Sequence, residues 1–208
     1  WVKAVDLYEQ ALGAVGKRDF LRKGEIQERI GYCIYQAAFQ AETCEEFKSR
    51  VTLAAEHYSD GARIFGAIEQ TEALSEFNNC KAMAAYAKSL LASDASEKKE
   101  LLNESLKFAQ EASKLQGERT DPMNVGKTCN NLLIILTDRL NIEWDAESRE
   151  KIIKEALECG EKAIGILSKD QDMRQLAQAY VNTAYFCSNA AFAKCLQAGR
   201  REDCREKA

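Results

Sequence analysis

Proline is almost absent from this 208-residue sequence, in which Pro122 is the single example. Proline breaks helices because it lacks a backbone N–H and fixes one torsion angle. Glycine, which also disfavours helix, is sparse at eleven residues. Alanine, leucine, glutamate and lysine, which favour helix, are abundant. The composition therefore predicts long helices separated by few turns.

Long apolar runs and a basic surplus are also missing. The strongest candidate, the apolar run from Leu132 to Leu136, stops before Thr137 and is far shorter than the roughly 18 residues that a membrane-spanning helix needs. The formal net charge of -4 differs from the strongly positive charge of a generic nucleic-acid-binding protein. No secretory leader pattern opens the sequence. We therefore expect a cytoplasmic protein that binds neither membranes nor nucleic acids.

Residue patterns for catalysis and metal binding are missing as well. His57 is the only histidine, and its place within a helical pattern favours a packed or surface side chain over a catalytic one. The eight cysteines form no C-x-x-C pair. This favours reduced, mostly buried thiols over a disulfide framework or a zinc site. Because hydrolase and nucleotide-binding motifs are absent too, we expect no enzyme activity, no catalytic residue, no metal and no cofactor.

Apolar residues recur at spacings of three and four, which is the period of a helix. The predicted helices cover residues 2–15, 24–41, 45–68, 72–92, 97–116, 124–142, 147–168 and 172–197. Thr43 and Asp94 each precede a glutamate at the third helical position, which is a pattern typical of helix N-caps. Asp145 stands at the equivalent place of the next helix. Residues 200–208 are expected to begin a further helix.

Small residues repeat along the chain at steps of 51, 50 and 51 residues. The four copies are Ala4-Tyr8-Ala11, Ala55-Ser59-Ala62, Ser105-Ala109-Ala112 and Ala156-Gly160-Ala163. Small side chains let helix axes approach closely, and a fixed step of this length indicates stacked helix pairs. We therefore predict an all-α solenoid of antiparallel helix pairs that forms a single domain over residues 1–208. The sequence begins at Trp1 and closes on a charged segment, which favours a fragment of a longer array or multidomain protein.

The repeated second-helix pattern resembles that of the tetratricopeptide repeats. The first helices add three stretches that resemble the Asn-Leu-Gly segment of this family: Arg29-Ile30-Gly31-Tyr32, Asn131-Leu132-Leu133-Ile134 and Asn182-Thr183-Ala184-Tyr185. The repeat here is longer than the usual unit of about 34 residues. The resemblance implies a right-handed superhelix whose first helices line a concave face.

The resemblance also implies which residues contact a partner. Asn131 and Asn182 fall on the position that grips the backbone of an extended peptide in this family, and Arg29 takes that position in the first unit. Further amides lie at matched places at Asn79 and Asn130, and aromatic residues occupy equivalent places at Tyr32 and Tyr185. The alternative, in which the amides bridge helices and the aromatic residues belong to the core, stays open.

These patterns favour a protein-protein interaction scaffold that binds a peptide or a partner helix on its concave face. The alternative is a regulatory or sensor arm of a signalling ATPase or transcription regulator. A helical array also exposes apolar faces at its ends, so we expect a possible homodimer through these ends.

Overall fold

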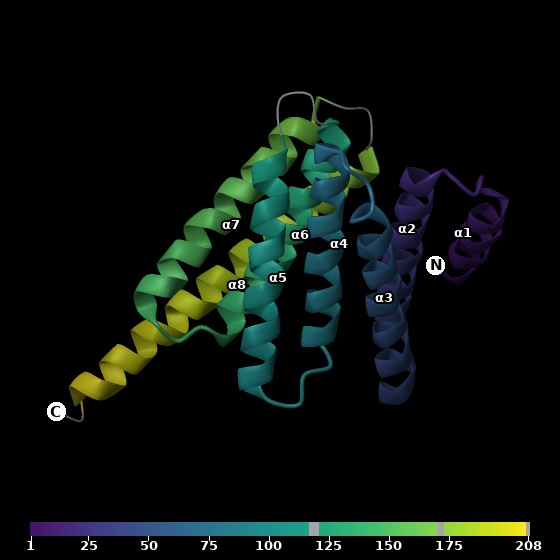
Figure 1. The fold of residues 1–208 in the computed structure, drawn as a ribbon. Helices are drawn as coiled ribbons and strands as arrows, with labels where there is room; N and C mark the ends of the chain where they lie inside the picture. The colour runs from purple at the N-terminus through teal and green to yellow at the C-terminus, as the bar shows by residue number, and fades with distance from the viewer. Residues whose placement is uncertain (117–120, 170–172, 207–208) are drawn as a thin grey trace. The chain divides into compact units, whose positions relative to one another are not determined.

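The computed structural model describes residues 1–116, 121–169 and 173–206, except for the side chains of Arg174 and of residues 192–206. Eight helices and no strands occur in these residues (Figure 1). The helices are α1 (Val2–Ala14), α2 (Phe20–Ala38), α3 (Cys44–Phe65), α4 (Thr71–Ser89), α5 (Ala95–Leu115), α6 (Pro122–Ile142), α7 (Ala146–Leu167) and α8 (Met173–Glu206). The predicted all-α class is confirmed for this part of the chain. Two boundaries differ by four residues or more. The helix α2 begins at Phe20 rather than at residue 24, and α8 continues without a break through the place where we expected a new helix after residue 199.

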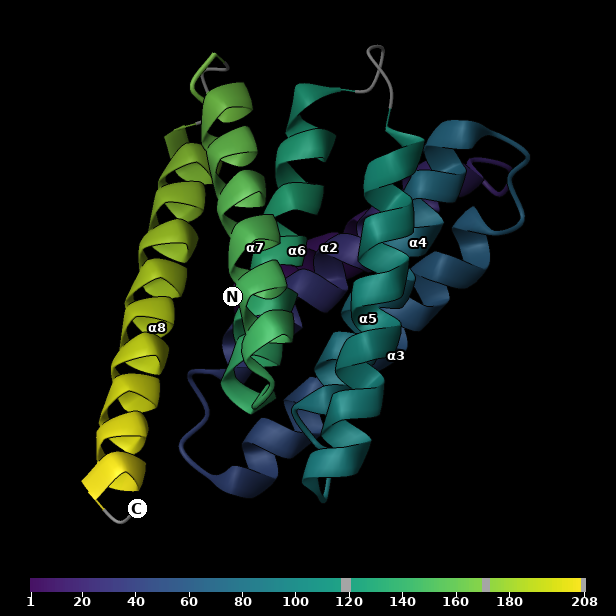
Figure 2. The same cartoon turned by 90° about the vertical axis from the view of Figure 1, so that its left-hand side faces the viewer.

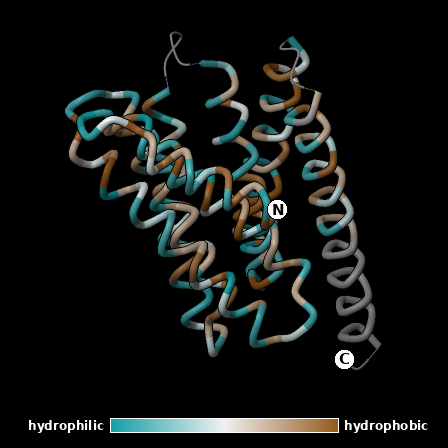
Figure 3. Tube along the Cα trace, turned by 90° about the vertical axis from the view of Figure 1, so that its right-hand side faces the viewer, coloured by the Kyte–Doolittle hydropathy of each residue, from teal (hydrophilic) through white to brown (hydrophobic). Residues whose placement is uncertain are grey.

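The contacts within the chain divide it into two compact units, Trp1–Thr120 with helices α1 to α5 and Asp121–Ala208 with helices α6 to α8. Each unit is described here by itself. Hydrophobic and hydrophilic residues are interspersed along the coloured parts of the helices (Figure 3). None of the helices in the described residues combines the length and the apolarity needed to cross a bilayer.

The predicted N-caps are present at the start of three second helices. The side chain of Thr43 accepts a hydrogen bond from the backbone N–H of Glu46, and Asp94 accepts from Ser96 and Glu97. Asp145 accepts from Ser148 in the same way. These bonds satisfy N–H groups that have no partner within the helix, so the sequence positions the start of α3, α5 and α7 locally.

Within the first unit, α2 and α3 form an antiparallel hairpin. A Cβ atom placed on Gly24 would lie 2.8 Å from the ring of Phe65, and one on Gly31 would lie 3.2 Å from the ring of Tyr58. Both aromatic rings are fully buried. The two glycines are therefore required because the rings of α3 lie directly against the α2 backbone.

The hairpin of α4 and α5 repeats this register. Ser75 Oγ donates to the carbonyl oxygen of Ala112 at 3.2 Å, and Ser105 Oγ donates to that of Ala82 at 2.8 Å. Ser75 lies 51 residues after Gly24, and Ala82 lies 51 residues after Gly31. The same positions on the first helix thus contact the second helix in both hairpins, but serine hydroxyls replace the aromatic rings.

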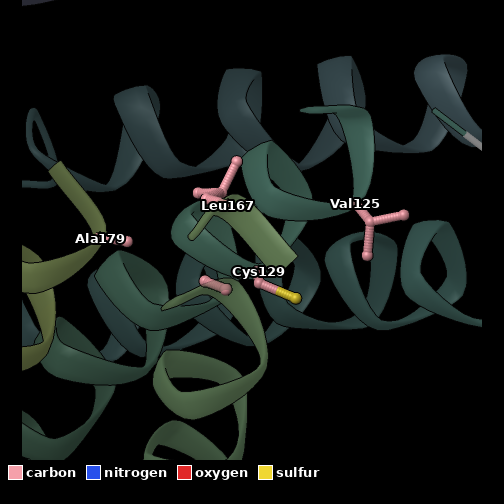
Figure 4. Packing of buried hydrophobic residues seen from close by; sticks show 5 residues of the cluster. Val125, Cys129, Leu167 and Ala179 are labelled. Carbon is pink, nitrogen blue, oxygen red and sulfur yellow. The ribbon is translucent and has the colours of Figure 1, made fainter. Parts of the chain in front are cut away.

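In the second unit, α6, α7 and α8 lie side by side (Figure 2). A Cβ atom on Gly126 would lie 2.6 Å from Leu167, so this pair repeats the contact of Gly24 with Phe65 after two steps of 51 residues. Leu167 joins Val125, Cys129, Ala163 and Ala179 in the buried cluster of this unit (Figure 4). The three complete hairpins therefore share one register.

The small-residue stripe is buried in α5 and α7, but it behaves differently in α1 and α3. In α3, Ala55 and Ala62 are buried in clusters with residues of α4, whereas Ser59 is exposed. The contact with α2 is made one residue earlier, by Ala54 and Tyr58. In α1 none of the residues is buried. Ser59 and the copy of the stripe in α1 therefore do not form the close helix contact that small residues at this spacing predict.

Candidate partner-binding surfaces

One candidate surface lies on the unit formed by α6 to α8. Asn131 is on α6 and Asn182 is on α8, and these two helices pack together. Both residues are half-buried. Asn182 Oδ1 accepts a hydrogen bond from Gln178 Nε2 at 2.7 Å, whereas its Nδ2 is buried and has no partner among the described residues. Such a donor is costly to leave unpaired. This part of the chain therefore contains an amide with unused hydrogen-bonding capacity at the position that the sequence singled out.

Asn130 and Asn79 lie deeper than their neighbours. Asn79 is fully buried and interacts with surrounding groups. Asn130 is also buried, and neither atom of its amide has a hydrogen-bond partner within the described residues. Glu28, which precedes Asn79 by 51 residues, is buried at the same register. The sequence patterns above did not single out Glu28, although the repeat spacing alone could have identified it as part of a buried polar series.

The first unit holds Arg29 and Tyr32 on α2. Tyr32 is half-buried and packs edge-on against Trp1, with the ring centroids 5.7 Å apart. Arg29 is half-buried too. Tyr185 occupies the equivalent place to Tyr32 on α8, but it is largely exposed. Two aromatic residues at matched sequence positions thus have different surroundings, because the Trp1 ring packs against Tyr32.

The cysteines and the histidine offer little reactive chemistry. The six cysteines whose side chains the structure describes are free thiols, and Cys33, Cys80 and Cys129 are buried. Burial raises the pKa of Cys129, and it raises the pKa of Cys159 to about 12. Such thiols remain protonated at neutral pH and are poor nucleophiles. His57 Nδ1 lies 2.7 Å from Gln27 Oε1, which fits a partly packed side chain.

Cys195 and Cys204 lie outside the described side chains. No group of three or more potential metal ligands occurs in the residues that the structure describes.

The connection between α6 and α7 contains a buried ion pair that the sequence did not reveal. Glu143 Oε2 lies 2.6 Å from Arg139, and Glu143 Oε1 accepts hydrogen bonds from the backbone N–H groups of Trp144 and Asp145. Burial by itself raises the pKa of Glu143, but the Asp145 N–H and the Arg139 guanidinium outweigh it and hold the pKa below its usual range. Glu143 therefore fixes the turn as an ionised carboxylate.

Comparisons with known proteins show no family for this chain. No protein-family model matches it. No curated protein matches it either. Among solved structures, it is similar to a chain from the computational design of self-assembling cyclic protein homooligomers. The identity is 13%, the similarity covers 95% of this chain and 82% of that chain, and the TM-score is 0.34. A similarity at this level carries no conclusion about family or function.

Proposed function

We propose that this protein is an interaction scaffold of the tetratricopeptide-like class, in which stacked helical hairpins present their first helices to a partner. The repeated register of the three hairpins supports this proposal, since repeat proteins are assembled from one helical template. The partner is a peptide or a helix of another protein. We further propose a cytoplasmic, non-enzymatic role, which the free thiols and their raised pKa values favour.

One observation carries the proposed site: Asn182 Nδ2 is buried but has no hydrogen-bond partner among the described residues. Rotation of this amide about its terminal torsion angle would present the N–H group to a backbone carbonyl of a bound peptide. Asn131, on the neighbouring helix α6, offers a second amide. An amide carries both donors and an acceptor, so it matches the N–H and C=O groups of an extended backbone.

The expected contribution follows from ordinary hydrogen-bond energies. Each neutral hydrogen bond contributes about 0.5 to 1.5 kcal/mol, so losing one bond at each of the two amides should weaken binding by about 1 to 3 kcal/mol, with a loss of at least about fivefold in affinity. Tyr185 lies three residues after Asn182 on α8 and is exposed, so it can add apolar contact beside the amides.

The test is a peptide selection followed by affinity measurement. Peptides selected from a displayed random library on the native protein are labelled, and their binding is measured by fluorescence anisotropy with the native protein and with the Asn131→Ala, Asn182→Ala double variant. We expect a loss of at least about fivefold in affinity for the double variant. The matched control is the Asn103→Ala, Asn141→Ala double variant, which removes two amides at exposed positions. Equal affinity of the native protein and the Asn131, Asn182 variant would exclude this site.

A further inference from the structure

The face of α8 that points away from α6 and α7 is apolar and exposed. We call it the α8 face and define it by Met173, Ala177, Tyr180, Val181, Ala184 and Ala191. Met173 is 70% exposed, Tyr180 54% and Val181 61%, and the three alanines are exposed too. The opposite side of the helix holds the buried residues Ala179, Phe186 and Ala190. Residues three and four apart share one side of a helix, so these side chains form a mostly apolar stripe, in which the exposed Ser188 lies between Ala184 and Ala191.

From Ala177 to Ala191 the α8 face also lacks charge. No charged residue occurs between Arg174 and Lys194. Exposed helix surfaces normally carry charged residues, whereas the centres of protein interfaces are depleted in them. An uncharged exposed stripe with large apolar side chains marks a surface that associates.

The repeat register indicates what kind of element covers this face. Two positions on the first helices recur at steps of 51 residues. Ala177 continues the series Gly24, Ser75 and Gly126. Ala184 continues the series Gly31, Ala82 and Leu133. In the hairpins, Gly24, Ser75 and Gly126 each contact an antiparallel second helix. The α8 face is thus the fourth copy of a surface that three times packs against an antiparallel helix.

The covering helix does not come from a hairpin within the described chain. The segments that turn the chain back after α2, α4 and α6 lie near residues 39–43, 90–94 and 143–145. The equivalent residues 192–196 are helical, because α8 runs on to Glu206. The chain therefore continues straight where the other hairpins turn.

We propose that the α8 face binds the α8 face of a second copy of this chain, with the two helices antiparallel about a twofold axis at Ala184. The small residues Ala177, Ala184 and Ala191 are spaced by seven. The same spacing separates Ala54 from Gly61, Ser105 from Ala112 and Ala156 from Ala163 on the second helices. The α8 face therefore has the positions at which a first helix contacts a second helix, and it also has the small residues with which a second helix makes that contact. The same face can thus pack against a copy of itself.

Charge and area agree with a symmetric pair. In an isologous contact the same surface of both copies meets, so a face that carries charge of one sign would repel the same face of its partner. The uncharged α8 face avoids this repulsion. From their exposed fractions, its residues offer at most about 500 Å² per protomer, or about 1,000 Å² in total, which is near the lower limit for a specific interface. Interfaces near this limit are typical of weak association, so we expect a dissociation constant in the micromolar range.

Pairing through α1 fits less well. The α1 residues at the register of Ala54 and Gly61 are Lys3 and Gln10, which are too large for a close helix contact. A contact between α1 and α8 of different copies would also be head-to-tail, and such contacts form rings or open chains rather than dimers.

The experiment measures oligomeric state by sedimentation equilibrium in the presence of a thiol reductant, which prevents disulfide formation through the exposed Cys44 and Cys187. The native protein should dimerise at micromolar concentration. Ala184→Arg should raise the dimer dissociation constant more than about a hundredfold, because it places a charge on the twofold axis and opposes it to its own copy. The matched control is Leu53→Arg on α3, which changes an exposed apolar residue of the other unit and should leave the dimer intact. Circular dichroism verifies that both variants keep their helix content.

A crosslinking arm tests the geometry independently of variant stability. In a background in which Cys44, Cys187, Cys195 and Cys204 are replaced by serine, Ala184→Cys should form a disulfide-linked dimer on oxidation, because a residue on the twofold axis faces itself. The same background without the new cysteine, and with Leu53→Cys, should not. A native protein that stays monomeric up to about 100 µM, a dimer that tolerates Ala184→Arg, or growth into higher oligomers would each overturn the proposal.

Discussion

Replacing Gly24 with alanine tests the shared hairpin register most directly. The added methyl group would lie 2.8 Å from the buried ring of Phe65, which is closer than packed atoms approach. Overpacking of this kind costs about 1 to 3 kcal/mol, while the higher helix propensity of alanine returns about 1 kcal/mol. We therefore expect Gly24→Ala to lower the free energy of unfolding by about 1 kcal/mol.

A control separates packing from propensity. Gly165 lies in α7, and a Cβ atom added there would meet nothing within 4 Å. Gly165→Ala should therefore raise the free energy of unfolding by up to about 1 kcal/mol. The two substitutions are chemically identical, so opposite signs can come only from the surroundings of the two glycines.

The measurement is urea unfolding followed by circular dichroism, with hydrogen exchange to locate the loss within α2 and α3. A smaller side chain opposite Gly24 should relieve the clash, so the double variant Gly24→Ala, Phe65→Leu should be less destabilised than the sum of the two single changes. If Gly24→Ala proves at least as stable as the native protein, the reasoning from the close contact of α2 and α3 fails.

Two further predictions concern the helix starts and the turn after α6. Asp94→Ala should lower the free energy of unfolding by about 1 kcal/mol in urea, because two backbone N–H groups at the start of α5 lose their acceptor; an unchanged midpoint would show that water replaces the cap. Glu143→Gln should cost about 2 kcal/mol at pH 7, because it leaves the buried Arg139 without its counter-charge. Since the pKa of Glu143 is lowered by folding, its contribution is complete above the unfolded value near 4.3 and is lost at lower pH. Urea midpoints from pH 7 to pH 3 should therefore show the gap between native protein and variant narrowing below about pH 4, and a constant gap would contradict an ionised role for Glu143.

The residues that we propose for partner binding show how far a sequence pattern reaches into tertiary structure. The spacing of Asn131 and Asn182 correctly places them on first helices, and these helices pack together in the second unit. The repeat spacing does not reveal that Asn79 and Asn130 are buried. Adjacent residues point about 100° apart on a helix, so a one-residue difference decides between surface and interior.

The sequence by itself determined the helices, the capped starts of α3, α5 and α7 and the step of 51 residues, because propensity, capping and periodicity act over a few neighbouring residues. Tertiary structure decided that Tyr58 rather than Ser59 is buried, that Glu143 lies in the turn with Arg139, and that α8 continues past the place where the other hairpins turn back. These outcomes depend on which neighbouring helix a side chain meets, and contacts between residues far apart in the chain set that choice.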